Sequence, residues 1–331
     1  MISDTVKFLL NDKILEINNP DPNQTILNYV RTELKKTGTK EGCAEGGCGA
    51  CTVVLGELKD NNINYTAVNS CITFLPTLTG KQLILVEDLI SKDNSLHPVQ
   101  EAMVKYHGSQ CGFCTPGFVM SLFSMFKNYS KLKEDIIKDS IAGNLCRCTG
   151  YKPIIKAAKS LRTKNKSDHF EKNKKQTIAL LKKIGNKSIS IYKKDKRYFA
   201  PRYVSELKKI LKKNSNSKLL SGGTDLSLIV TKDRKAIESI IYMNSIKELD
   251  YIKNNNKYIE VGATTSLSSF ETYIKKYYPD FNKILKRYGS IQIRNVATIA
   301  GNLATASPIG DNLPLLLALD SQIVLQGTKK T

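Results

Sequence analysis

Residues 42–51 are Gly42-Cys43-Ala44-Glu45-Gly46-Gly47-Cys48-Gly49-Ala50-Cys51. This loop carries three cysteines, and Cys71 follows as the next one in the chain. The glycines let the backbone wrap closely and aim N–H groups at the sulfurs, which stabilises negative charge there. The loop therefore predicts a four-thiolate site, its last ligand brought in by the fold.

The spacing of these cysteines is the strongest clue to what they bind. Four intervening residues, then two, then a distant fourth cysteine match a plant-type 2Fe-2S ferredoxin. Zinc also accepts four thiolates, but it usually uses two short Cys-x2–4-Cys knuckles. Disulfides need an oxidising compartment, for which the sequence offers no secretion signal. An iron–sulfur cluster is the favoured interpretation, with zinc and disulfides as alternatives.

A second set of four cysteines comes later in the chain, as the pairs Cys111-x2-Cys114 and Cys146-x-Cys148. All eight cysteines fall within residues 43–148, and 31 residues separate the two later pairs. Each pair lies at a predicted helix start or inter-helix loop, where helix dipoles offset anionic charge. We expect a second 2Fe-2S site here.

The hydrophobic pattern divides the first half of the chain into two domains. Thr5–Leu10 and Lys13–Ile17 read as a hairpin, followed by a helix capped by Thr25, with further strands at Cys51–Leu55 and Leu83–Val86. Helical runs then replace the strands, at Val99–Tyr106, Gly117–Phe126, Leu132–Ile141 and Ile154–Leu161. We expect an α+β domain at 1–85 and a four-helix domain at 86–161.

The net charge of +21 is concentrated between these domains and the last one. Residues 161–218 hold 19 Lys and Arg against 4 Asp and Glu, and they contain no recognisable nucleic-acid-binding motif. This favours a solvated linker, predicted at 162–196, over an acidic partner surface or a nucleic-acid site. No apolar run is long enough to span a bilayer. We expect a cytoplasmic protein that binds neither nucleic acid nor a membrane.

The last domain, predicted at 197–331, contains a candidate phosphate-binding turn. Strands are expected at Lys218–Leu220, Ile240–Met243, Tyr258–Val261 and Gln322–Gln326. After the first of them, the run Ser221-Gly222-Gly223-Thr224-Asp225 offers small residues and exposed N–H groups that suit a pyrophosphate. By itself such a run is more often a plain glycine turn, and Gly262-Ala263-Thr264-Thr265 is similarly ambiguous.

Three longer strings together resemble the molybdenum hydroxylase family. They are residues 42–51, Gln110 to Gly117 with Gly143 to Tyr151, and Gln292 to Asp311. The resemblance covers about residues 5–160 and 198–325. It implies an α+β multidomain chain with a β-grasp ferredoxin domain, a helical 2Fe-2S domain and part of an FAD-binding domain of the vanillyl-alcohol oxidase type.

The resemblance also implies roles for individual residues. The first cluster would be held by Cys43, Cys48, Cys51 and Cys71, and the second by Cys111, Cys114, Cys146 and Cys148. FAD would be bound by Lys218, Leu219, Leu220, Ser221, Gly222, Gly223, Thr224, Asp225, Tyr288, Ala297, Thr298, Ile299, Ala300, Gly301 and Asp311. Gln110 would approach a molybdopterin on a partner chain, and this chain would contain no catalytic residue.

The implied function is electron transfer in an oxidoreductase of the xanthine dehydrogenase type. A molybdopterin-binding large subunit would supply the electrons, and NAD+ would accept them after FAD. An aldehyde or heteroaromatic dehydrogenase, or a stand-alone electron carrier, is the alternative. Because the family's flavin domain continues further than Thr331, we expect a truncated flavin domain that binds FAD weakly by itself.

Overall fold

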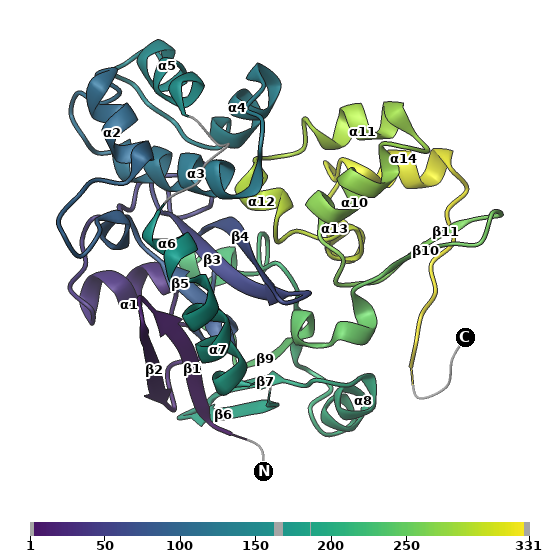
Figure 1. The fold of residues 1–331 in the computed structure, drawn as a ribbon. Helices are drawn as coiled ribbons and strands as arrows, with labels where there is room; N and C mark the ends of the chain where they lie inside the picture. The colour runs from purple at the N-terminus through teal and green to yellow at the C-terminus, as the bar shows by residue number, and fades with distance from the viewer. Residues whose placement is uncertain (1–2, 162–167, 186, 328–331) are drawn as a thin grey trace.

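The first part of the chain is a five-stranded mixed sheet crossed by one helix (Figure 1). Its elements are β1 Thr5–Leu10, β2 Lys13–Asn18, α1 Ile26–Thr32, β3 Thr52–Lys59, β4 Asn62–Asn69 and β5 Gln82–Ile84, with short 3-10 turns at Leu75–Leu78 and Val86–Leu89. The strand order is β2-β1-β5-β3-β4, with β1 parallel to β5. This is the β-grasp arrangement, as the resemblance implies.

Local sequence explains the start of this domain. Asn11 has φ of 55°, a left-handed conformation that asparagine tolerates, and it turns β1 back onto β2 with Leu10 opposite Lys13. Thr25 caps α1 by accepting a hydrogen bond from the Asn28 N–H, as predicted. The missed strand β4 buries Ile63 and alternate residues after it, a period-2 signal hidden among asparagines.

The helical domain packs around α3. Its helices are α2 Pro98–Lys105, α3 Thr115–Asn128, α4 Glu134–Ile141 and α5 Lys152–Ser160. Residues from Gly117 through Phe126 are all buried, so α3 is enclosed on every side. Its core also takes in Val54 and Ile84 from the β-grasp sheet. The two iron–sulfur candidate domains therefore share one hydrophobic core.

The described part of the basic segment is structured rather than extended. The structure is a computed structural model that describes residues 3–161, 168–185 and 187–327. Within the basic segment, α6 His169–Lys172 and α7 Lys174–Ile184 are followed by β6 Ile189–Lys193. The carboxylate of Asp168 is buried with Lys127, 3.0 Å away, and with His97, 3.1 Å away. This cluster fixes the segment to the helical domain.

The last part of the chain contains a four-stranded sheet and a helical region. The remaining strands are β7 Lys196–Ala200, β8 Lys218–Leu220, β9 Ser239–Tyr242, β10 Ile252–Asn254 and β11 Ile259–Val261. The helices are α8 Val204–Lys213, α9 Leu228–Thr231, α10 Leu267–Ile274, α11 Pro279–Leu285, α12 Ile291–Arg294, α13 Ile299–Thr305 and α14 Asn312–Ala318, with 3-10 turns at Met243–Ser245 and Lys247–Leu249. The sheet order is β6-β7-β9-β8.

Two expectations differ from the structure. The sheet begins at β6, so the predicted linker already contains its first strand and the start of β7. The run Gln322–Gln326 is extended, but it belongs to none of the three sheets in the described residues, and Ile323 is 62% exposed. Its short run of apolar residues, two of them β-branched, is a strand signal, but strand formation also needs a neighbouring strand in register.

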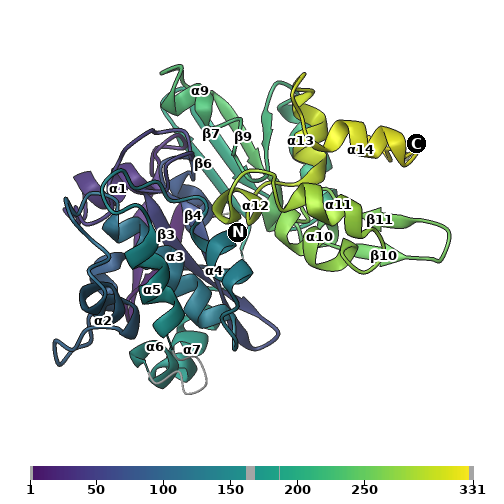
Figure 2. The same cartoon turned by 90° about the horizontal axis from the view of Figure 1, so that it is seen from above.

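The elements form two lobes with a joint between them (Figures 1 and 2). The purple-to-teal lobe holds β1 to α7, and the yellow-green lobe holds α10, α11, α13 and α14, while α12 lies between them. The sheet of β6 to β9 shares a core with the β-grasp domain, in which Phe8 and Tyr198 are both fully buried. Among the described residues, no helix is long and apolar enough to cross a membrane.

Candidate functional site

The first four cysteines come together as two pairs. The thiols of Cys51 and Cys71 lie 3.2 Å apart and share a hydrogen bond, although 20 residues separate them. This sharing lowers the pKa of Cys51 and raises that of Cys71. On the loop itself, the N–H of Cys48 donates to the Cys43 sulfur at 3.3 Å. The Cys51–Cys71 pair joins the glycine-rich loop to the segment after β4, whereas Cys43 and Cys48 pair within the loop.

The loop aims backbone N–H groups at the sulfurs. At Cys43 burial favours the neutral thiol, but the N–H groups of Glu45, Cys48 and Gly47 outweigh it, so the pKa of Cys43 is lowered. The N–H of Gly46, whose φ of 79° suits glycine, acts in the same direction on Cys71. This environment stabilises thiolates, which are the metal-binding form of cysteine.

The second four cysteines also form two pairs. Cys146 and Cys114 hydrogen-bond through their side chains, as do Cys148 and Cys111. At Cys146 burial favours the thiol, but Thr149 donates from both its hydroxyl and its N–H, and the net pKa falls to about 7. Cys111 and Cys148 are exposed, and Gln110 next to them is exposed as well.

Two thiol pairs in each set match the ligand needs of a two-iron cluster. In the described residues, no three His, Cys, Asp or Glu side chains converge on one ion position. In a four-cysteine 2Fe-2S cluster each iron takes two thiolates, so two pairs per site are what the cluster needs. None of the eight cysteines forms a disulfide, and the 3.2 Å between Cys51 and Cys71 exceeds the length of an S–S bond.

The two cysteine loops touch each other. The N–H of Leu145 donates to the Cys48 carbonyl oxygen at 2.9 Å, which links residues beside ligand candidates of both sets. A Cβ at Gly49 would overlap the Gly143 carbonyl, and one at Gly117 would overlap the Gly49 carbonyl. Only glycine allows this approach, so the loops lie in backbone contact.

The predicted FAD segments meet behind the first loop. A Cβ at Gly222 would overlap the Val296 carbonyl, so the turn after β8 lies directly against the segment that leads into 297–301. Thr298 caps α13 by accepting from the Gly301 N–H at 2.9 Å. The turn and this helix N-terminus thus present N–H groups side by side, an arrangement that suits phosphate.

Other predicted FAD residues gather nearby. Burial raises the pKa of Tyr288, and the charges of Asp311 and Asp225 raise it further. The Tyr288 hydroxyl accepts from the Asn302 side chain at 3.3 Å, which ties it to α13. The Asn312 N–H in turn donates to the Asn302 side-chain oxygen at 3.3 Å, so the segment that follows Asp311 lies beside Tyr288 and α13.

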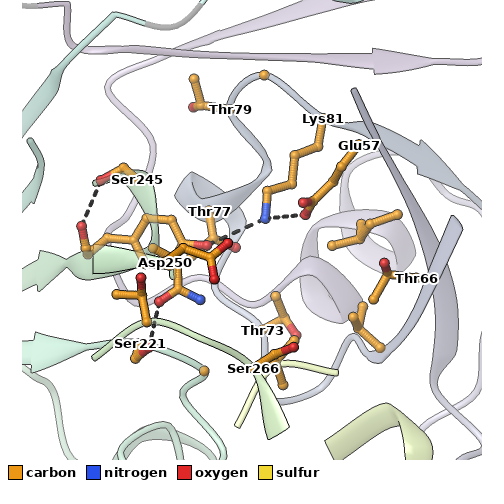
Figure 3. Close-up of a pocket in the computed structure, with 18 of the residues that line it drawn as sticks. Glu57, Thr66, Thr73, Thr77, Thr79, Lys81, Ser221, Ser245, Asp250 and Ser266 are labelled. Atoms are coloured by element: carbon orange, nitrogen blue, oxygen red, sulfur yellow. Dashed lines mark hydrogen bonds and ion pairs between the residues drawn. The ribbon is translucent and has the colours of Figure 1, made fainter. Parts of the chain in front are cut away.

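A polar cavity of about 710 Å³ continues from the turn on its other side. Figure 3 shows Ser221 and Ser245 facing Lys81 and Glu57 across it, with the Lys81 ammonium 2.7 Å from the Glu57 carboxylate. Ser221 donates to the Asn244 side chain at 2.5 Å. The hydroxyls of Ser227 and Thr264, also in the lining, are buried and have no hydrogen-bond partner among the residues that the structure describes.

The first cysteine loop contacts the flavin part directly. Lys232, just after α9, forms a 2.8 Å ion pair with Glu45 inside the loop. Ile293 and Leu228 pack against the buried Cys51 and Cys71. Sequence reasoning did not find Lys232 or Ile293 as loop neighbours, because contacts across roughly 200 residues leave no local period.

Three known domain families match successive parts of the chain. Residues 8–76 match the 2Fe-2S iron-sulfur cluster binding domain, residues 85–159 match the [2Fe-2S] binding domain, and residues 191–331 match the FAD binding domain in molybdopterin dehydrogenase. Two 2Fe-2S domains followed by an FAD-binding domain define an iron–sulfur flavoprotein.

Curated relatives narrow the assignment. The chain is 32% identical to xanthine dehydrogenase of Emericella nidulans, over 99% of this chain and 28% of the relative. It is 31% identical to xanthine dehydrogenase/oxidase of Mus musculus, again over 99% and 28%. The chain thus spans less than a third of these relatives' length. It belongs to the molybdenum hydroxylase family, in which these relatives are xanthine dehydrogenases.

Solved structures include two similar proteins. Quinoline 2-oxidoreductase from Pseudomonas putida 86 is 26% identical, with a TM-score of 0.41 over 54% of this chain and 96% of that chain. Aldehyde oxidoreductase from Desulfovibrio gigas is 33% identical, with a TM-score of 0.41 over 48% of this chain and 16% of that chain.

Proposed function

We propose that this chain is the electron-transfer part of an oxidoreductase of the xanthine dehydrogenase type. The observation that carries the proposal is the order of sites in space. The second cysteine set, whose Cys111 and Cys148 are exposed, touches the first set through Leu145 and Cys48. The first set adjoins the flavin part through the Glu45–Lys232 pair. Such a row suits transfer from an external donor to a flavin.

In this proposal the residue roles follow the pairs. Cys43, Cys48, Cys51 and Cys71 hold one 2Fe-2S cluster, and Cys111, Cys114, Cys146 and Cys148 hold the other. Residues 218–225 and 297–301 bind the FAD diphosphate, and the cavity beside Ser221 receives the adenosine half. When bound, these groups exchange single electrons at the clusters and electron pairs at the flavin. The loop N–H groups, the glycines and the Lys232–Glu45 pair hold them in place.

The partner in this proposal is a molybdopterin-binding large subunit that covers the second cysteine set, with Gln110 facing that subunit. NAD+ is the proposed acceptor, and purine hydroxylation the proposed reaction of the whole enzyme. A cytoplasmic location suits cysteines that must stay reduced to bind iron. The proposed parts are 1–85, 86–161, a basic connector at 162–196, and the flavin part at 197–331 with β6 added to its sheet.

Metal, sulfide and flavin analysis of the protein purified from its host tests the proposal. We expect about four irons and four acid-labile sulfides per chain, because eight cysteines form two four-thiol sites. A molybdopterin-bearing chain should copurify. Stoichiometric zinc without visible absorbance contradicts the proposal, whereas iron without a molybdopterin chain favours a stand-alone electron carrier.

A further inference from the structure

Helix α12 lies where the three parts of the chain meet (Figures 1 and 2). Its fully buried Arg294 pairs with Asp139 of α4 at 2.5 Å. Asn295, directly after the helix, donates from its side chain to the Ala67 carbonyl of β4 at 2.9 Å. The start of the string that resembles a flavin domain therefore faces the cysteine domains, and only its later residues face the flavin segments.

Gln292 is the residue of α12 that reaches both cysteine domains. It is 0% exposed. Its side-chain nitrogen lies 3.3 Å from the Thr52 hydroxyl, 3.1 Å from the Ser121 hydroxyl and 3.1 Å from the Asn144 side-chain oxygen. Thr52 follows Cys51, and Asn144 precedes Cys146 by two positions. One amide thus contacts the neighbours of both cysteine sets.

The surroundings fix the orientation of this amide. The Thr52 hydroxyl donates to the Gly49 carbonyl at 2.7 Å, and the Ser121 hydroxyl donates to the Asn144 oxygen at 2.7 Å. Because both hydroxyl hydrogens are already donated to these acceptors, the Thr52 and Ser121 oxygens can only accept a hydrogen bond from Gln292. A reversed amide would place an oxygen against three acceptors, and the buried donor would be lost.

Asn144 connects the two loops, and its side chain is oriented by the hydrogen bond from Gln292. Its side-chain nitrogen donates to the Gly49 carbonyl at 3.0 Å and to the Thr52 hydroxyl at 3.3 Å. The same loop is bound through the Leu145 N–H to Cys48. A Cβ at Gly143 would overlap the Gln292 side-chain oxygen. Gln292 therefore fills the junction and orients the side chain that joins the loops.

We propose that Gln292 is a positioning residue, whose amide holds the two cysteine loops at a fixed separation from within the flavin part. The inference rests on the proposed function, because it concerns the separation of two clusters. Electron exchange and magnetic interaction between paramagnetic centres both weaken with distance. The amide, not the bulk of the side chain, does the positioning, because its nitrogen makes all three contacts.

The test compares Gln292→Met with Gln176→Met in the full chain carrying its clusters. Methionine keeps the length and volume of glutamine but cannot donate, and Gln176 is an exposed residue of α7 that serves as the control. Dithionite reduces the clusters, and paramagnetic resonance of the frozen protein records each cluster signal and their mutual splitting. We expect Gln292→Met to keep its iron and both signals while part of the splitting is lost.

The control should match the wild type in every measurement. Splitting in Gln292→Met equal to that of the control overturns the proposal, as does wild-type protein that holds both clusters but shows no splitting. If Gln292→Met does not fold, Ser121→Ala removes one contact from the same network and should lose part of the splitting. Wild-type protein without iron refutes the proposed function instead.

Discussion

Replacing Asp168 by asparagine should loosen the helical domain, because its charge is what neutralises a buried lysine. The side chains of Asp168, Lys127 and His97 are each about 1% exposed. The Val99 N–H donates to His97 Nδ1 at 3.2 Å, so the ring proton lies on Nε2 and points at Asp168. Asp168→Asn leaves the shape of this cluster nearly intact but removes its negative charge.

The expected cost is about 3–5 kcal/mol, since the variant loses the buried carboxylate that stabilises the Lys127 charge. Glu171, 3.5 Å from Lys127 and partly exposed, offsets little of it. Adding Lys127→Met removes the buried positive charge as well. The double variant should recover roughly 1–3 kcal/mol of the loss, because the two residues act as one unit.

Hydrogen exchange followed by mass spectrometry measures the effect where it arises. Peptides from α2 and α3 should exchange about a hundredfold to several thousandfold faster in Asp168→Asn, since each 1.4 kcal/mol is a factor of ten. Asp280→Asn is the matched control, because its pair with Lys283 is exposed and contributes little. Unchanged exchange in α2 and α3, or losses that simply add in the double variant, would refute the reasoning.

Three further predictions follow from the sites. Cys43→Ser and Cys146→Ser should each remove a different cluster signal and about two of four irons, measured by paramagnetic resonance and iron assay; losing both signals from either variant contradicts the pairing. Gly222→Ala should weaken FAD binding in an equilibrium titration, because its Cβ overlaps Val296; wild-type affinity would contradict this. His97 and Lys127 outweigh burial and hold the Asp168 pKa at about 2, below its usual 3.8. The pair's stability should therefore be present above about pH 4 and lost as pH falls towards 2; protection factors of α2 amides, which correct for the pH dependence of intrinsic exchange, should show this loss in the wild type and not in Asp168→Asn.

Local signals in the sequence predicted most elements and the grouping of the cysteines. The cap at Thr25, the apolar residues of the strand Lys218–Leu220 and the apolar run of α3 are all signals that lie within a few residues. The cysteine spacing predicted two sets because loop ligands lie close in sequence. Whether these thiols and the flavin residues bind the predicted groups stays a prediction.

The contacts that join the parts could not be predicted in this way. The buried pair of Asp168 with Lys127 lies in a segment that reads as a charged linker, where one buried carboxylate looks like any surface acid. Gln292 sits in a string that resembles a flavin motif, yet its amide serves the cysteine loops. Such roles depend on which surfaces meet in three dimensions, and these contacts leave no periodic pattern in a single sequence.

The common core of the β-grasp sheet and the β6–β9 sheet limits where the chain can be divided into fragments that still fold. Ser3 bridges to Ile189, and Phe8 and Tyr198 belong to the same buried cluster. A fragment ending before residue 189 would turn an interior apolar surface into an outer one, which favours aggregation. Swapping the N-terminal module between relatives would likewise need matched changes on β6 and β7, so recombination should preserve these segments as a unit.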